Sequence, residues 1–262
     1  MTRRLALTGL TVLASFAFAS ACTQGTPGAT ATTPTKTASE TLTEAAGKTT
    51  GQSFKYTVDY GTTVKGDGAL DSTGQNSESN MTVTVPDAGV TLKLNSLIVA
   101  GDIYVKIDLG PLTAAVPGLK DLGNKWMHID KSKIGNAGLI SQFTPSQESV
   151  GANSFVKGVV TAEKVSDTEI KGTLDLTKSA PGVLQKDQIA AFGEEAKKVP
   201  FTATLDAQGR ISKLVLNMPK AGTLPAADLT TTYTDYGATV TIAKPAAAEV
   251  VEAPDLIYTF LQ

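Results

Sequence analysis

The chain has 262 residues, of which 41% are hydrophobic and 18% are charged. This composition suits one large or two small domains with a buried core and excludes a disordered polyelectrolyte. The net charge of −2 argues against a nucleic-acid partner, which needs a dense basic surface. With one cysteine and one histidine, an internal disulfide and a multi-cysteine metal site are excluded, so we expect no metal and no cofactor.

Residues 1–21 have the pattern of a secretory signal peptide. Arg3 and Arg4 precede an almost uncharged run of about 14 residues, and small residues follow at positions 19–21. The run is shorter than the roughly 20 residues that a membrane-spanning helix needs. A twin-arginine export signal is an alternative, but the residues after Arg4 lack the rest of that pattern.

Cys22, the only cysteine, directly follows these small residues. Its position resembles a bacterial lipobox, in which the thiol receives a diacylglyceryl group, although Ala19 stands where leucine is usual. The alternative is an ordinary signal peptide with an incidental cysteine, but an unpaired thiol in an exported protein is prone to oxidation. We therefore predict lipidation at Cys22 and anchoring at the extracytoplasmic face of the cell membrane, since two or more acyl chains hold a protein firmly.

Residues 22–37 are predicted to be the lipidated cysteine and a flexible tether. The stretch after Cys22 is rich in threonine and proline, carries one charge and shows no apolar periodicity. Its composition also permits O-glycosylation. We assign 38–245 to the folded domain and 246–262 to a C-terminal tail whose apolar end packs back onto that domain.

The first half of the folded domain predicts one helix followed by strands. Thr41 and Glu44 fit a capping box, which predicts a short amphipathic helix near 38–49. Beyond it the apolar period changes to two, as in strands with one buried face. The alternating segments are 54–60, 81–85, 91–95, 103–109 and 125–130, and short turns between them predict an antiparallel meander.

The second half begins irregularly, because residues 111–122 and 132–155 break the alternation. Leu139, Ile140 and Phe143 fit a short helix or a loop. A helix is predicted over 187–198, capped by Asp187. The predicted strands are 159–165, 170–176, 201–205, 211–218, 229–236 and 239–242.

About ten strands and two or three helices predict an α+β fold. Strand twist accumulates in a long antiparallel sheet, so the sheet must curl. We expect a curled half-barrel whose concave face is covered by helices. Gly66, Gly68 and Gly172 lie in strand-like stretches, where they are expected to ease curling or form bulges.

Several motifs together resemble the actinobacterial LppX/LprA/LprF/LprG lipoprotein family. They are the lipobox cysteine with its tether, IYVK at 103–106, DLGNKW at 121–126, TLDAQGRI at 204–211, and YTDYG at 233–237 followed by Val240 and Ile242. The resemblance covers most of 38–245 but not the tail after Pro245. It implies a LolA/LolB-like half-open barrel with an apolar cavity, which binds acylated lipids or glycolipids and carries them within the cell envelope.

That resemblance also implies that apolar residues of adjacent central strands line the cavity. The candidates are Leu92, Leu94, Ile103, Val105, Ile107, Met127 and Ile129. The same residues would serve equally well in a solid core, and the sequence leaves that alternative open. The expected partners are the acyl lipid or glycolipid, the membrane and a membrane transporter. The alternative function is a surface lipoprotein that carries nothing and acts as an interaction module for a sensor or an envelope-assembly complex.

We expect no enzymatic activity. His128 alternates with Met127 and Ile129, so it is predicted to point to the outer face beside Trp126. The sequence has no Gly-x-Ser-x-Gly motif and no phosphate-binding glycine loop. Five aspartates in or near predicted turns have no calcium-loop pattern around them, namely Asp71, Asp87, Asp102, Asp108 and Asp206.

Overall fold

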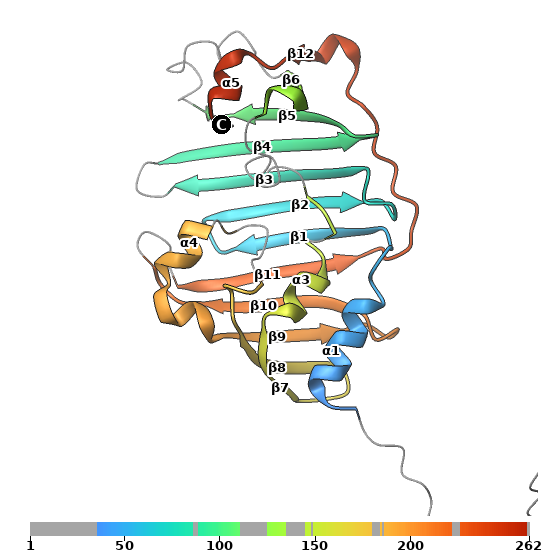
Figure 1. Cartoon of the computed structure of the whole chain (residues 1–262), viewed down its shortest axis with the longest axis vertical. Coiled ribbons are helices and arrows are strands. Elements are labelled where there is room, and N and C mark those ends of the chain that lie inside the picture. The colour runs from blue at the N-terminus through green and yellow to red at the C-terminus, as the bar shows by residue number, and fades with distance from the viewer. Residues whose placement is uncertain are drawn as a thin grey trace, which may run out of the picture. The chain divides into compact units, whose positions relative to one another are not determined.

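In the computed structural model, twelve strands form one open, curled sheet with a few short helices (Figure 1). The structure describes residues 36–85, 89–110, 125–134, 145–147, 149–179, 184, 186–221 and 226–260. Within these ranges the fold is α+β and mostly sheet, as predicted, and the number of strands exceeds the expected ten.

Some predicted features lie outside the described residues. They are the signal peptide 1–21, Cys22, the tether up to residue 35, Asp87, the segment 111–122, the motif residues 121–124, the predicted helix or loop at Leu139, Ile140 and Phe143, and the side chain of Asp187.

The strands follow the meander that the periodicity predicted. In chain order they are β1 (Phe54–Tyr60), β2 (Val64–Leu70), β3 (Ser77–Val85), β4 (Val90–Val99), β5 (Asp102–Asp108), β6 (Trp126–Ile129), β7 (Val159–Lys164), β8 (Glu169–Leu174), β9 (Val199–Leu205), β10 (Ile211–Met218), β11 (Ala227–Thr234) and β12 (Val250–Glu252). Their spatial order is β12-β6-β5-β4-β3-β2-β1-β11-β10-β9-β8-β7. Every neighbouring pair is antiparallel except β12 with β6, which is parallel.

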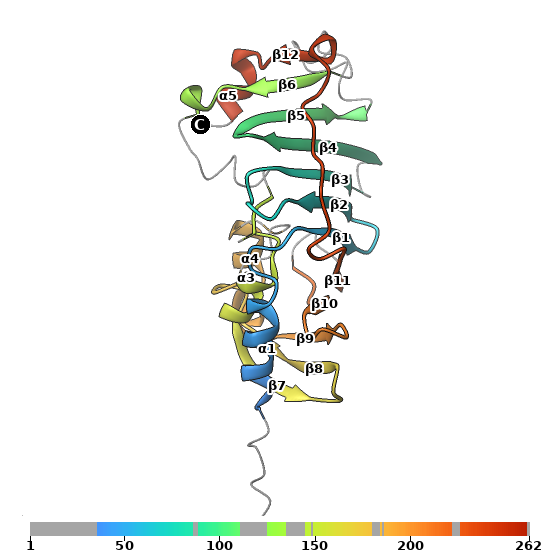
Figure 2. The same ribbon diagram turned by 90° about the vertical axis from the view of Figure 1, so that its right-hand side faces the viewer.

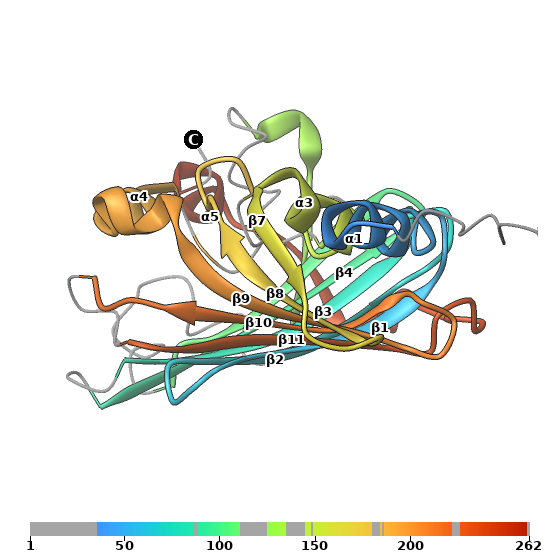
Figure 3. The same ribbon diagram turned by 90° about the horizontal axis from the view of Figure 1, so that it is seen from below.

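The helices gather on one side of the sheet. The α-helices are α1 (Ala38–Gly47), α3 (Ala152–Lys157), α4 (Lys186–Ala191) and α5 (Asp255–Phe260), and the short 3₁₀ helices are η4 (Lys131–Lys133), η5 (Gly193–Lys197) and η6 (Ala247–Glu249). Figure 3 shows the four α-helices on the same side of the sheet, which curls toward them at the β7 end. We call this side the inner face. None of the helices in the described ranges is long and apolar enough to cross a membrane.

Two apolar clusters lie on the inner face. The larger joins α1, α3 and α4 to β1 and β7–β11, and it includes Leu42 of α1, Tyr60 of β1 and Phe201 of β9. The smaller lies at the other end of the sheet, between β5, β6 and α5. In Figure 2, α1, α3 and α4 lie beside the lower strands, and α5 lies near β5 and β6.

Helix α1 begins at a different capping box from the one predicted. Thr37 accepts a hydrogen bond from the Glu40 backbone N–H, and the Glu40 carboxylate accepts one from the Thr37 N–H. The bonds that this carboxylate accepts from the Thr37 N–H and hydroxyl lower the pKa of Glu40. Because the helix begins at Ala38, the side chains of Ala38 and Leu42, four residues apart, are both buried in the large cluster. The Thr41–Glu44 pattern has the same spacing but lies inside the helix.

Two other predictions are wrong. The helix predicted over 187–198 is α4 followed by η5, because Gly193, the first residue of η5, has a φ of +57°. The strand predicted over 239–242 is irregular. Strand β11 already pairs with β1 on one side and β10 on the other, so the residues that follow it find no free partner beside it.

Gly66 and Gly68 cause no bulge, because the pairing of β2 with both neighbours is continuous. Their role is close packing. A Cβ at Gly66 would lie 2.2 Å from the Sδ of Met81, and one at Gly68 would lie 2.5 Å from the Tyr56 hydroxyl. The side chains of Met81 from β3 and Tyr56 from β1 therefore lie over β2 at its two glycines. The pairing irregularities occur elsewhere, at Val159–Thr161 and Ile211–Lys213.

Candidate ligand-binding site

The seven predicted lining residues all lie on the inner face of neighbouring strands. In the pairing of β4 with β5, Leu94 is opposite Ile107. In the pairing of β5 with β6, Ile103 is opposite Ile129 and Val105 is opposite Met127. Partners that are directly opposite share a face, and residues two apart along a strand do so too. The periodicity therefore identified a real row of apolar side chains, and Leu92 falls in it two residues before Leu94.

The row divides into a buried part and a partly exposed part. Ile103, Val105, Met127 and Ile129 are buried in the small cluster. Leu94 and Ile107 pack against that cluster but are only half-buried, and Leu92 is half-buried as well.

Strand β3 extends the exposed part of the row. Met81 is opposite Leu94, and Val83 is opposite Leu92. Both are half-buried, and Val85 at the end of the strand is 40% exposed. The alternation in 81–85 predicted this strand, but the sequence offered no reason to add these residues to the site.

Small residues form a strip across the inner face between the two clusters. Gly68 of β2 is opposite Ser79 of β3, which is opposite Ser96 of β4. Ser77, Ser79 and Ser96 are all buried, and the Ser77 hydroxyl finds no hydrogen-bond partner in the described part of the chain. Tyr56 lies beside this strip, and burial raises the pKa of its hydroxyl to about 12, so the phenol stays neutral.

A small, partly open apolar pocket lies beneath α3. It has a volume of about 50 Å³ and is lined by Val58, Val150, Phe155, Leu216 and Tyr233 among others. Ligand pockets typically have about 300–1,000 Å³. This pocket is therefore too small for an acyl chain. The Tyr233 hydroxyl beside it donates to the Val150 carbonyl oxygen (2.9 Å), and burial raises its pKa.

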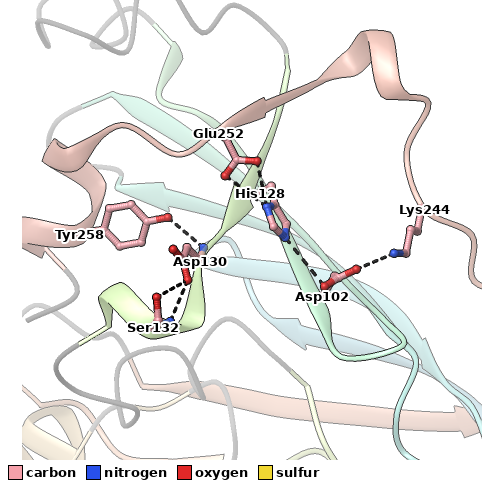
Figure 4. Close-up of polar contacts among 7 residues, drawn as sticks. All are labelled: Asp102, His128, Asp130, Ser132, Lys244, Glu252 and Tyr258. Atoms are coloured by element: carbon pink, nitrogen blue, oxygen red, sulfur yellow. Dashed lines mark hydrogen bonds and ion pairs between the residues drawn. The ribbon is translucent and has the colours of Figure 1, made fainter.

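His128 lies on the outer face, as the alternation predicted, opposite Tyr104 of β5. Its Nδ1 is 3.1 Å from a Glu252 carboxylate oxygen, and its Nε2 is 3.9 Å from Asp102 (Figure 4). Lys244 donates a hydrogen bond to Asp102, which lowers the pKa of that carboxyl and raises the pKa of the lysine. Lys244 precedes η6, and Glu252 is the last residue of β12, so these pairs fasten this segment of the chain to the sheet.

An open cleft of about 500 Å³ lies between this end of the chain and the outer face. Its lining includes Asp102, Tyr104, His128 and Glu252, which are engaged with one another or with Lys244. Among the described residues, no group of three or more His, Cys, Asp or Glu side chains is placed to hold a metal ion.

No protein-family model matches the chain, and no curated protein matches it. The candidate site therefore rests on the geometry of the inner face: an apolar row from β3 to β6, bordered by small polar residues, buried at one end and partly open in the middle.

Proposed function

We propose that the protein is a membrane-anchored lipoprotein that binds acylated lipids or glycolipids on the inner face of β3–β6 and carries them within the cell envelope. The proposal includes lipidation at Cys22, attachment at the extracytoplasmic face and exchange with a membrane transporter. The observation that carries it is the row of half-buried apolar side chains on three adjacent strands, to which Met81, Leu94 and Ile107 belong.

Such a row has the chemistry that an acyl chain requires. Contiguous exposed apolar surface in a soluble domain marks a binding surface. Each methylene removed from water contributes about 0.8 kcal/mol, and part of the total is offset by ordering of the chain. The apolar row carries no ionised group, whereas the polar side chains of the same strands, such as Lys93 and Asp108, point to the outer face.

The β7–β11 end of the sheet, where α1, α3 and α4 pack, is a poorer place for a ligand. The pocket beneath α3, of about 50 Å³, holds little more than a water molecule or two. We therefore locate the proposed lipid at β3–β6 and give α1, α3 and α4 a structural role.

The proposal is tested by native mass spectrometry of the full-length protein expressed in an actinobacterium. Leu94→Trp and Ile107→Trp fill the row from two opposed strands, and we expect each to lower lipid affinity about tenfold, or about 1.4 kcal/mol. Lys93→Trp is the matched control, because Lys93 is exposed on the outer face of the same strand. Ligand-free wild-type protein, or equal losses in all three variants, would refute the proposal.

A second candidate is a surface lipoprotein that carries nothing and serves as an interaction module for a sensor or an envelope-assembly complex. The small size of the pocket beneath α3 favours it. This candidate predicts wild-type protein without lipid and a protein partner whose binding is lost in Leu94→Trp but kept in Lys93→Trp.

A further inference from the structure

The end of the chain covers part of the apolar row. After β11, residues 235–249 run past the ends of the neighbouring strands to the free edge of β6, where β12 pairs in parallel (Figures 1 and 2). Helix α5 then turns onto the inner face (Figure 3). Three residues of this end are buried against β5 and β6, namely Ala253, Ile257 and Tyr258.

The apolar surface under α5 continues into the half-buried part of the row beside it. On β5, Val105 is 7% exposed and belongs to the small cluster, while Ile107, two residues further on the same face, is half-buried. Val105 and Ile107 are both apolar, so the strand supplies the same kind of side chain in the buried and in the half-buried part of the row. Helix α5 packs over the buried part.

Within the described part of the chain, few polar contacts attach α5 and the strand before it. The Ala253 N–H donates to the His128 carbonyl oxygen (3.0 Å), and the Asp130 N–H donates to the Tyr258 hydroxyl (2.9 Å; Figure 4). Lys133 lies 3.9 Å from the Asp255 carboxylate, whose side chain is 98% exposed, so this ion pair contributes little. The strand that precedes α5 has three residues. Short terminal segments with few buried contacts open at low free-energy cost.

We propose that an acyl chain binds the inner face of β5 and β6 in the place of α5, which is a displaceable cover of the ligand site. The inference rests on the proposed function, because it names where on the same apolar row the chain lies. A ligand that replaces Ile257 and Tyr258 recovers the apolar contacts that they make within the small cluster. The apparent affinity then equals the affinity of the open site multiplied by the fraction of molecules in which α5 is displaced.

Hydrogen exchange of the full-length wild-type protein provides the first test. Ligands usually slow exchange where they bind. Here, saturation with cis-parinaric acid, a fluorescent fatty acid, is expected to slow exchange in β5 and β6 and to speed it in residues 253–260. Slower or unchanged exchange in 253–260, with binding intact, would overturn the proposal while leaving lipid binding in place.

Point variants of the cover provide the second test. Ile257→Ser weakens packing of α5 without changing the sheet, and we expect cis-parinaric acid to bind about tenfold more tightly, because the open fraction rises. Tyr258→Phe keeps the ring but loses the bond to the Asp130 N–H, so we expect a gain of about threefold. Thr259→Ala changes the exposed side of α5 and is the matched control, with unchanged affinity.

The outcomes separate this inference from the proposed function. Unchanged or weaker binding in Ile257→Ser, in a protein that still binds the probe, refutes the cover alone. If neither the wild type nor any of the three variants binds the probe, both the cover and the carrier are refuted. Tighter binding in Ile257→Ser but not in Thr259→Ala supports both.

Discussion

The two ends of the sheet are built from similar alternating strands but are packed differently. At the β7–β11 end, three helices bring Leu42, Phe155 and other side chains into one large buried cluster. At the β2–β6 end, among the described residues, the short helix α5 packs over a small buried cluster, and Leu94 remains half-buried. Period-two patterning therefore predicts which side chains share a face of the sheet, but not which elements pack against that face.

We expect the largest loss of stability from a substitution at the β7–β11 end of the sheet. Phe201 is 2% exposed and its ring meets that of Phe155 edge to face, with the centroids 4.9 Å apart. Phe201→Ala should lower the free energy of unfolding by about 3–5 kcal/mol, because the surrounding helices and strands cannot collapse fully into the space. Urea denaturation measures this loss. A loss below about 1 kcal/mol would mean that this end is no better packed than the other.

An intermediate effect is expected where α5 is the only described helix over the strands. Ile129 is 3% exposed in the small cluster. Ile129→Ala should cost about 2 kcal/mol, at the low end for such substitutions, since a short terminal helix can shift into the space. The same urea titration measures it, and Val99→Ala on β4, a half-buried outer-face position, serves as a control. A cost equal to that of Phe201→Ala would remove the contrast between the two ends.

The smallest effect concerns the β9–β10 hairpin. Burial raises the pKa of Asp206, but hydrogen bonds from the backbone and side chain of Arg210 outweigh it, so the pKa is lowered. A lowered folded-state pKa gives stability that is present above the unfolded value of about 3.9 and is lost as the pH falls through the folded value. Asp206→Asn should therefore cost about 1 kcal/mol at pH 7 and nothing at pH 2.

Thermal unfolding at several pH values measures this difference between wild type and variant. Asp130→Asn at the other end is the comparison, because among the described residues the Asp130 carboxylate accepts hydrogen bonds from Ser132 alone, through its N–H and hydroxyl. We expect its effect to be smaller. A pH-independent difference for Asp206→Asn would rule out the carboxylate as the cause.

Much of the sheet could be predicted because each strand shows its own local alternation. β2 and the three-residue β12 were exceptions. In β2, Gly66 and Gly68 have no side chains to alternate, so the strand showed only as a strand-like stretch. The wrong strand at 239–242 did alternate, with Val240 and Ile242, but pairing requires a free neighbour, which a local pattern cannot reveal.

The candidate site could also be predicted in part, from the same local alternation. Seven residues were assigned to one face, and the register of β4, β5 and β6 confirms that they share it. Their role in binding remains a proposal. The cover could not be foreseen in detail, because β12 pairs with β6 through a contact between Val251 and Met127 that no local signal marks. Only the apolar end of the tail indicated that it would pack back, and this is confirmed for Ile257 and Tyr258.

The position of α1 has a geometric consequence for an anchored protein. The chain enters the domain beside β7, whereas β6 and β12 lie at the opposite end (Figure 1). Twelve strands about 4.8 Å apart place these two ends roughly 50 Å from each other. If the proposed anchor at Cys22 holds the domain with β7 nearest the membrane, the proposed lipid site would face away from that bilayer. Exchange of lipid with the same bilayer would then require the domain to tilt, whereas delivery to a more distant acceptor would not.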